Sequence, residues 1–172
     1  MGETQNKLIL LYVMDKMEVP LEDDIVTSMC SQDNSWVAFL ECKEAITKLC
    51  ETGFIHKTLA GGKVIYSITP EGRICLANFY TRIPLSLREE ITEYVKKSRI
   101  TYRKKQEYFS DYYKNKDGSY TVALKINEPN GGKALVELKM IVDSRTSAKY
   151  VYTSWEEKAA KIYELLSDNL LD

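Results

Sequence analysis

The chain has 172 residues, of which 44% are hydrophobic, with 24 Lys and Arg against 25 Asp and Glu. This length allows one domain or two small ones, and the composition is typical of a folded protein rather than a disordered one. The net charge of −1 excludes an overall basic, nucleic-acid-binding chain, so any DNA binding has to come from a local patch.

Membrane, metal and cofactor functions are not expected. No run of 18 apolar residues could span a bilayer, and Met1–Thr4 lacks the basic start of a signal peptide, so we expect a cytoplasmic protein. His56 is the only histidine and the four cysteines form no CxxC pair, which argues against a metal site and against acid–base catalysis. We expect Cys30, Cys42, Cys50 and Cys75 to be reduced thiols; a redox-sensing pair is the alternative.

Apolar residues recur at helical spacing three times in the first third of the chain. They predict a helix from about Thr4 to Met17, a second from Leu21 to Cys30 after Pro20, and a third within Trp36–Thr52. The polar stretch Ser31–Ser35 is predicted to be a turn. In the third helix the expected inward face is formed by Phe39, Cys42, Ile46, Leu49 and Cys50.

A hairpin and a fourth helix follow. Gly53 suits a left-handed helix cap, and the strand-like runs 54–59 and 63–68 flank Ala60-Gly61-Gly62, where glycines favour a tight turn. Thr69-Pro70 then predicts an N-cap and a first helical proline, with the helix reaching about Arg82. Three helices, a hairpin and a helix are typical of a winged helix-turn-helix domain over residues 1–83.

These motifs also resemble known families. Glu51–Ile55 and Tyr66–Arg73 are similar to the passage from the third helix into the wing of PadR- and MarR-type bacterial regulators. Thr4–Tyr12, Pro20-Leu21 and Arg82–Pro84 resemble more closely a family of clostridial-type proteins known only as a winged-helix domain of unknown function. The resemblance implies a transcriptional regulator that binds DNA, and we expect a homodimer because a two-fold protein matches a palindromic site.

Residues 84–105 are predicted to form a connecting helix with a basic end. Residues 84–116 carry 9 basic against 5 acidic side chains, whereas residues 1–83 carry 8 against 11, a net of −3. The basic end either contacts phosphates beside the winged helix or is an ordinary solvated helix end that complements the helix dipole.

After Gln106 the apolar period changes to two. Three strands are predicted over 108–116, 120–128 and 134–142, with turns at Asp117-Gly118 and Asn130–Gly132, followed by a helical tail from Asp143-Ser144 that is one bent helix or two. The fold class is therefore α+β: an N-terminal winged helix-turn-helix, a connecting helix, and a C-terminal three-stranded antiparallel sheet with helices on one face. Residues 106–172 would serve oligomerisation or the sensing of a ligand or partner.

Function follows from this arrangement as an expectation. The chain is predicted to be no enzyme but a regulator that binds duplex DNA through the third helix and the wing, with itself as partner and a small-molecule or protein effector at the C-terminal domain. The alternative is a winged-helix scaffold that binds proteins and not DNA. The candidate DNA-binding residues are Lys43, Glu44, Thr47, Lys48, Lys57, Gly61, Gly62, Lys63, Lys96, Arg99 and Arg103.

Overall fold

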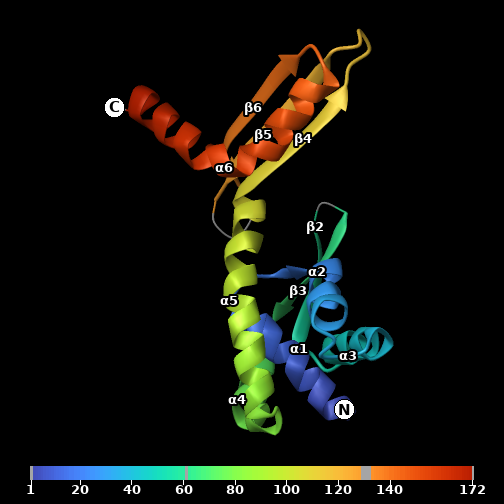
Figure 1. Ribbon diagram of the computed structural model, residues 1–172. Helices are drawn as coiled ribbons and strands as arrows, with labels where there is room; N and C mark the ends of the chain where they lie inside the picture. The colour runs from blue at the N-terminus through green and yellow to red at the C-terminus, as the bar shows by residue number, and fades with distance from the viewer. Residues whose placement is uncertain (1, 61, 129–132, 172) are drawn as a thin grey trace. The chain divides into compact units, whose positions relative to one another are not determined.

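The computed structural model describes residues 2–60, 62–128 and 133–171. They form two compact units, Met1–Arg99 and Ile100–Asp172, and the boundary falls inside a long helix. Each unit combines helices with one three-stranded antiparallel sheet, so the predicted α+β class is confirmed (Figure 1).

Unit 1 is built around its first helix. Leu8–Leu11, Val13 and Met17 of this helix are buried, and it contacts the third and fourth helices and one strand of the sheet. The elements in chain order are α1 (Glu3–Met17), β1 (Leu21–Glu22), α2 (Asp23–Thr27), the π-helix η1 (Ser28–Asp33), α3 (Phe39–Glu51), β2 (Ile55–Ala60), β3 (Lys63–Ile68), α4 (Pro70–Phe79), the 3₁₀ turn η2 (Tyr80–Arg82) and α5 (Leu85–Glu107).

The second predicted helix is wrong in its bounds. Leu21 and Glu22 form strand β1, which pairs with Tyr66 and Ile65 of β3, and the helix begins only at Asp23. At its other end, helical structure continues as η1 through the predicted turn as far as Asp33, and the chain reverses near Ser35, which has a φ of 54°.

The signals for the hairpin and the fourth helix are confirmed. Gly53 has a φ of 75°, and β2 and β3 pair from Ile55 opposite Ile68 to Ala60 opposite Lys63. Gly62 has a φ of 77°, whereas Gly61 lies outside the described residues. The Thr69 hydroxyl accepts a hydrogen bond from the Gly72 N–H at 3.1 Å, with Pro70 at the first helical position.

The first part of α5 packs on unit 1. Ile91 and Val95 are buried, and the indole Nε1 of Trp36 donates to Glu90 Oε1 at 2.8 Å. The rings of Trp36 and Tyr94 meet edge to face with centroids 5.5 Å apart. This helix therefore closes the core of unit 1.

The sheet of unit 2 is a meander, and one of its faces is covered by a long helix (Figure 1). The strands are β4 (Tyr108–Lys114), β5 (Tyr120–Asn127) and β6 (Ala134–Val142), and the helix is α6 (Arg145–Leu170), capped by Ser144. Its core consists of Val122, Leu124, Ile126, Ala148, Trp155 and Ala159. The turn at Gly118 is confirmed by its φ of 90°, and the one predicted at Asn130–Gly132 lies outside the described residues.

Candidate nucleic-acid interface

Helix α3 exposes a mainly polar face. Cys42, Ile46 and Leu49 are buried as predicted, together with Ala45. The prediction that Phe39 lies on the inward face is wrong, because this side chain is 49% exposed. Phe39 is the first residue of α3, and at this end the apolar face of the helix extends beyond the core. The outward side chains are Leu40, Glu41, Glu44, Thr47 and Glu51, with Lys43 and Lys48 half-buried beside them.

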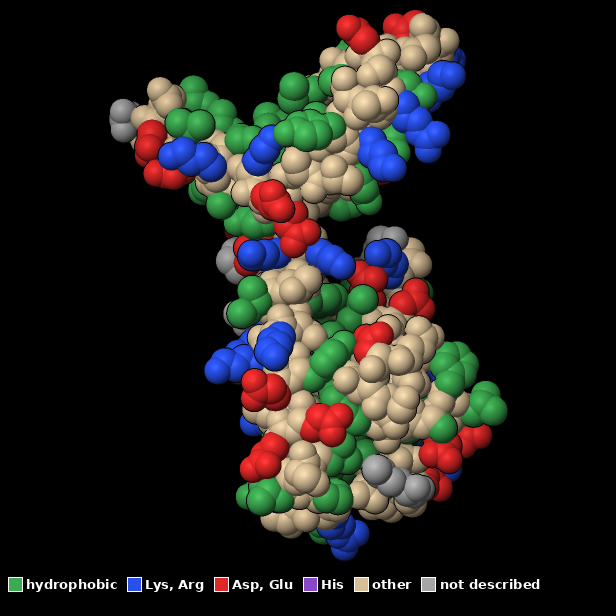
Figure 2. All heavy atoms as spheres, viewed as in Figure 1, with side chains coloured by type: hydrophobic (Ala, Val, Ile, Leu, Met, Phe, Trp, Pro, Cys, Tyr) green, Lys and Arg blue, Asp and Glu red, His purple; other side chains and the backbone are tan. Residues whose placement is uncertain are grey.

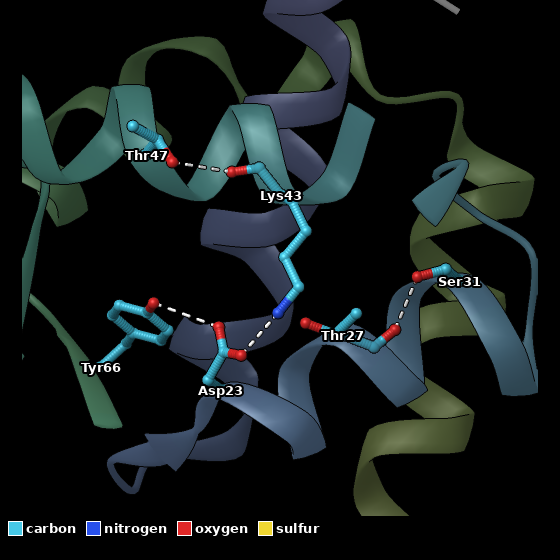
Figure 3. A network of polar contacts seen from close by, with 6 residues as sticks. All are labelled: Asp23, Thr27, Ser31, Lys43, Thr47 and Tyr66. Atoms are coloured by element: carbon cyan, nitrogen blue, oxygen red, sulfur yellow. Dashed lines mark hydrogen bonds and ion pairs between the residues drawn. The ribbon is translucent and has the colours of Figure 1, made fainter. Parts of the chain in front are cut away.

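Lys43 belongs to a network that joins α2, α3 and β3 (Figure 3). Its Nζ lies 2.5 Å from Asp23 Oδ2, and the hydroxyl of Tyr66 donates to Asp23 Oδ1 at 3.1 Å. Burial and the neighbouring Asp23 carboxylate raise the pKa of Tyr66 well above its usual range, so the phenol stays a donor. Thr47, one turn further along α3, is exposed and donates its hydroxyl to the Lys43 carbonyl at 3.0 Å.

Two more candidate lysines form ion pairs with carboxylates near the start of the chain. Lys48 Nζ lies 2.8 Å from Glu3 Oε1, which also accepts Lys7 at 2.8 Å. The hydrogen bonds from Lys48 and Lys7 lower the pKa of Glu3 from 4.5 to about 2. On the hairpin, Lys63 Nζ lies 3.1 Å from Glu22 Oε2, so β1 and β3 are also linked by an ion pair.

The remaining candidate side chains differ in whether they form contacts within the protein. Within the described part of the chain, Lys57 on β2 and Lys96 on α5 are exposed and have no ion pair. Arg99 is not free, because its Nη1 donates to the Lys16 carbonyl at 3.2 Å and lies 3.2 Å from Glu18 Oε2. The side chain of Arg99 thus binds the C-terminal end of α1, whereas Lys96 is exposed to solvent; the side chain of Arg103 is not described.

The structure therefore brings Lys43, Thr47, Lys48 and Glu44 together on α3 and places Lys57 and Lys63 on the neighbouring hairpin. The sequence did not reveal that carboxylates from α1, β1 and α2 compensate three of these lysines. Figure 2 shows hydrophobic side chains beside acidic ones on the exposed end of α3. No pattern along α3 alone could have signalled these pairs, because each carboxylate lies 20 or more positions away.

The predicted effector site in the C-terminal domain is supported less by the structure than the surface of α3 and the hairpin. Tyr108, Tyr112 and Tyr120 pack against the core of unit 2, so these aromatic side chains fill the sheet–helix interface. A hollow of about 460 Å³ lies on α6, lined by Arg145, Thr146, Lys149, Tyr150 and Thr153. Among the described residues, no group of three or more His, Cys, Asp or Glu side chains could hold a metal ion. None of the helices in the described part of the chain combines the length and the apolar composition of a membrane span.

Comparison with known proteins places the chain in one family. A family model described as a domain of unknown function, DUF4364, matches residues 6–170 and so covers both units. The chain belongs to the DUF4364 family. No curated protein and no solved structure matches it. Membership in DUF4364 carries no stated activity, and the comparisons give no support to the resemblance to PadR- and MarR-type regulators.

Proposed function

We propose that residues 1–83 are a winged helix-turn-helix domain and that the protein is a cytoplasmic regulator that binds duplex DNA as a homodimer. The pairing of elements in unit 1 carries this proposal: α2 and α3 lead directly into the β2–β3 hairpin, and β1, which precedes α2, adds to that hairpin as a third strand. In such a domain the second helix of the pair enters the major groove and the hairpin contacts the adjacent backbone.

The side chains on α3 and β2 are suited to this role. Thr47 and Glu44 are exposed on α3, and carboxylates and hydroxyls can hydrogen-bond to base edges, with glutamate accepting from cytosine N4. Lys57 on β2 is exposed and has no ion pair within the described residues, so it is available to a phosphate. Glu44 and Thr47 would thus contact bases and Lys57 a phosphate, and Lys48 would contact either one.

The ion pairs of Lys48 and Lys63 are compatible with DNA binding. Both pairs lie on the surface, where solvent screens them and they add little to stability, so a phosphate can take the place of the carboxylate. The displaced Glu3 and Glu22 would still repel DNA. We therefore expect Glu3→Gln to tighten DNA binding, because it leaves Lys48 and Lys7 without a competing anion.

The experiment that tests this function is selection of bound fragments from the source genome at low salt, followed by affinity measurement on the selected duplex. Lys48→Gln/Lys57→Gln should weaken binding and reduce the slope of log affinity against log salt by about 0.9 for each lost phosphate contact. Lys116→Gln/Lys161→Gln, with two exposed lysines of unit 2, removes the same charge and is the matched control. Equal affinity of both variants across salt concentrations would contradict the proposed interface.

A second function is favoured by one observation. Phe39 and Leu40 are 49% and 73% exposed at the start of α3, next to Glu41 and Glu44, which is typical of a protein-binding surface more than of a DNA reader. As a scaffold, the unit would bind a protein with a basic rim and an apolar centre. If genome selection at low salt enriches no fragment, the scaffold function replaces the regulator.

A further inference from the structure

Strand β6 forms an open edge of the sheet in unit 2. Its nine residues, Ala134–Val142, pair with β5 alone, and among the described residues no strand lies on its other side. Three large apolar side chains of β6 are exposed: Leu135 (45%), Met140 (49%) and Ile141 (73%). A long apolar edge with unpaired backbone groups is a template for pairing with another strand.

The sequence of β6 indicates which strand pairs with it. Around Leu138 the strand is self-complementary when a second copy runs antiparallel: Glu137 falls opposite Lys139, and Val136 opposite Met140. The same register sets Leu135 opposite Ile141, so the exposed apolar residues are matched as well. We propose that β6 pairs with β6 of a second copy of this chain, with the two-fold axis at Leu138, and so joins two sheets of unit 2 into one of six strands.

Charge complementarity distinguishes a second copy from an unrelated strand. Glu137 already lies 3.3 Å from Lys125 of β5, on the face that α6 does not cover, so the partner's Lys139 would give this carboxylate a second cation. Opposite charges facing each other across strands stabilise pairing, and like charges destabilise it. A register shifted by two residues would place Lys139 opposite its own copy or Glu137 opposite its own copy.

Helix α6 provides a second, independent observation. It contacts β4 and β5 more than β6, and its second half projects beyond the sheet on the β6 side (Figure 1). This projecting half carries Leu165 and Leu170, and Leu171 follows it directly; these leucines are 50%, 72% and 76% exposed, and Figure 2 shows hydrophobic side chains along the helix. An axis perpendicular to the sheet places both α6 helices on the same face, where these leucines would cover the partner's strands.

The pairing specifies the homodimer of the proposed function but does not depend on DNA binding, because the oligomeric state is measured without DNA. The unsubstituted chain, with a mass of 19.8 kDa, should sediment as a dimer at tens of micromolar. Glu137→Lys and Lys139→Glu each create two like-charge pairs across the axis and should raise the dissociation constant by about tenfold.

Mixing these two variants gives the decisive result. In the mixed dimer every cation again faces an anion, so an equimolar mixture should recover the affinity of the unsubstituted chain. A purely intramolecular role of Glu137 with Lys125 predicts no recovery. A monomeric unsubstituted chain, undisturbed single variants, or a mixture that stays dissociated would each overturn the proposal.

Cross-linking determines the register of the two β6 strands, and it tests the proposal even if a charge variant folds poorly. Leu138→Cys places two thiols opposite each other at the axis, where Cα atoms of paired strands lie about 4.5–5.5 Å apart and a disulfide can form. Ile141→Cys is the matched control, because six residue steps separate its two copies by ~20 Å. We expect an oxidised covalent dimer for Leu138→Cys above the background of the native thiols. Equal cross-linking of both variants would contradict the register.

Discussion

Gly72 offers a sharp test of how α4 is attached to the hairpin. A methyl group at this buried position would lie 2.1 Å from the Phe54 carbonyl oxygen and 3.0 Å from Ile68 Cγ1. The same oxygen accepts a hydrogen bond from the Thr69 N–H at 3.1 Å, so it cannot turn away without losing that bond. Gly72→Ala must therefore move the backbone where α3 passes into β2.

The size of the effect follows from two opposing terms. Alanine in a helix is favoured over glycine by about 0.5–1 kcal/mol, whereas overpacking costs about 1–3 kcal/mol. Because the obstacle is a backbone atom, we expect the upper end of that cost and a net loss of about 2 kcal/mol in the free energy of unfolding. For a domain of this size such a loss lowers Tm by about 8–16 °C.

Thermal unfolding followed by tryptophan fluorescence measures this loss in unit 1. The chain has two tryptophans, Trp36 in unit 1 and Trp155 in unit 2, so a Trp155→Phe background leaves Trp36 as the reporter. Asn78→Ala, at an exposed position of the same helix, is the control and should change the free energy by less than about 0.5 kcal/mol. A Gly72→Ala protein as stable as its parent would refute the reasoning.

Three further predictions concern single side chains. The Glu3 carboxyl should titrate near pH 2 by NMR, and its pKa should rise in Lys48→Met. Because the pKa is depressed in the folded protein, the stability that Glu3 contributes is present above about pH 4.5 and is lost as the pH falls toward 2. Lys96→Gln should reduce the salt slope of DNA binding by about 0.9 without affecting folding, whereas Arg99→Gln should lower Tm, because Arg99, unlike Lys96, binds the end of α1. The opposite pattern in denaturation and binding assays would exclude these roles. The hydrogen bond with Cys42 and burial raise the pKa of Cys30, so peroxide should leave the DNA affinity of the unsubstituted chain unchanged, and Cys30→Ser should reduce stability only. A peroxide response of the unsubstituted chain that Cys30→Ser abolishes would favour a redox sensor.

The parts of the fold that depend on local chemistry could be predicted from the sequence. Thr69-Pro70 starts α4, Gly53 ends α3, and Gly118 turns β4 into β5, because each acts through its own backbone preference or through a partner within a few positions. The change from helical to alternating spacing near Gln106 also located the sheet of unit 2.

Features that depend on distant partners could not be predicted. β1 has two residues, too few for any periodicity, and exists because Leu21 and Glu22 pair with β3 more than 40 positions later. In the same way, Lys48 is held by Glu3, and Arg99 by the end of α1. The charge available on α3 therefore depends on packing between elements and not on the composition of α3.

The most direct test of the central claim is cross-linking of the protein to a duplex selected from its genome, with the linked peptides identified by mass spectrometry. DNA binding through the winged helix predicts links within α3, residues 39–51, and within the hairpin, residues 55–68, and predicts their loss when excess selected duplex competes. Links confined to residues 100–172, or no enrichment of any fragment at low salt, would contradict it.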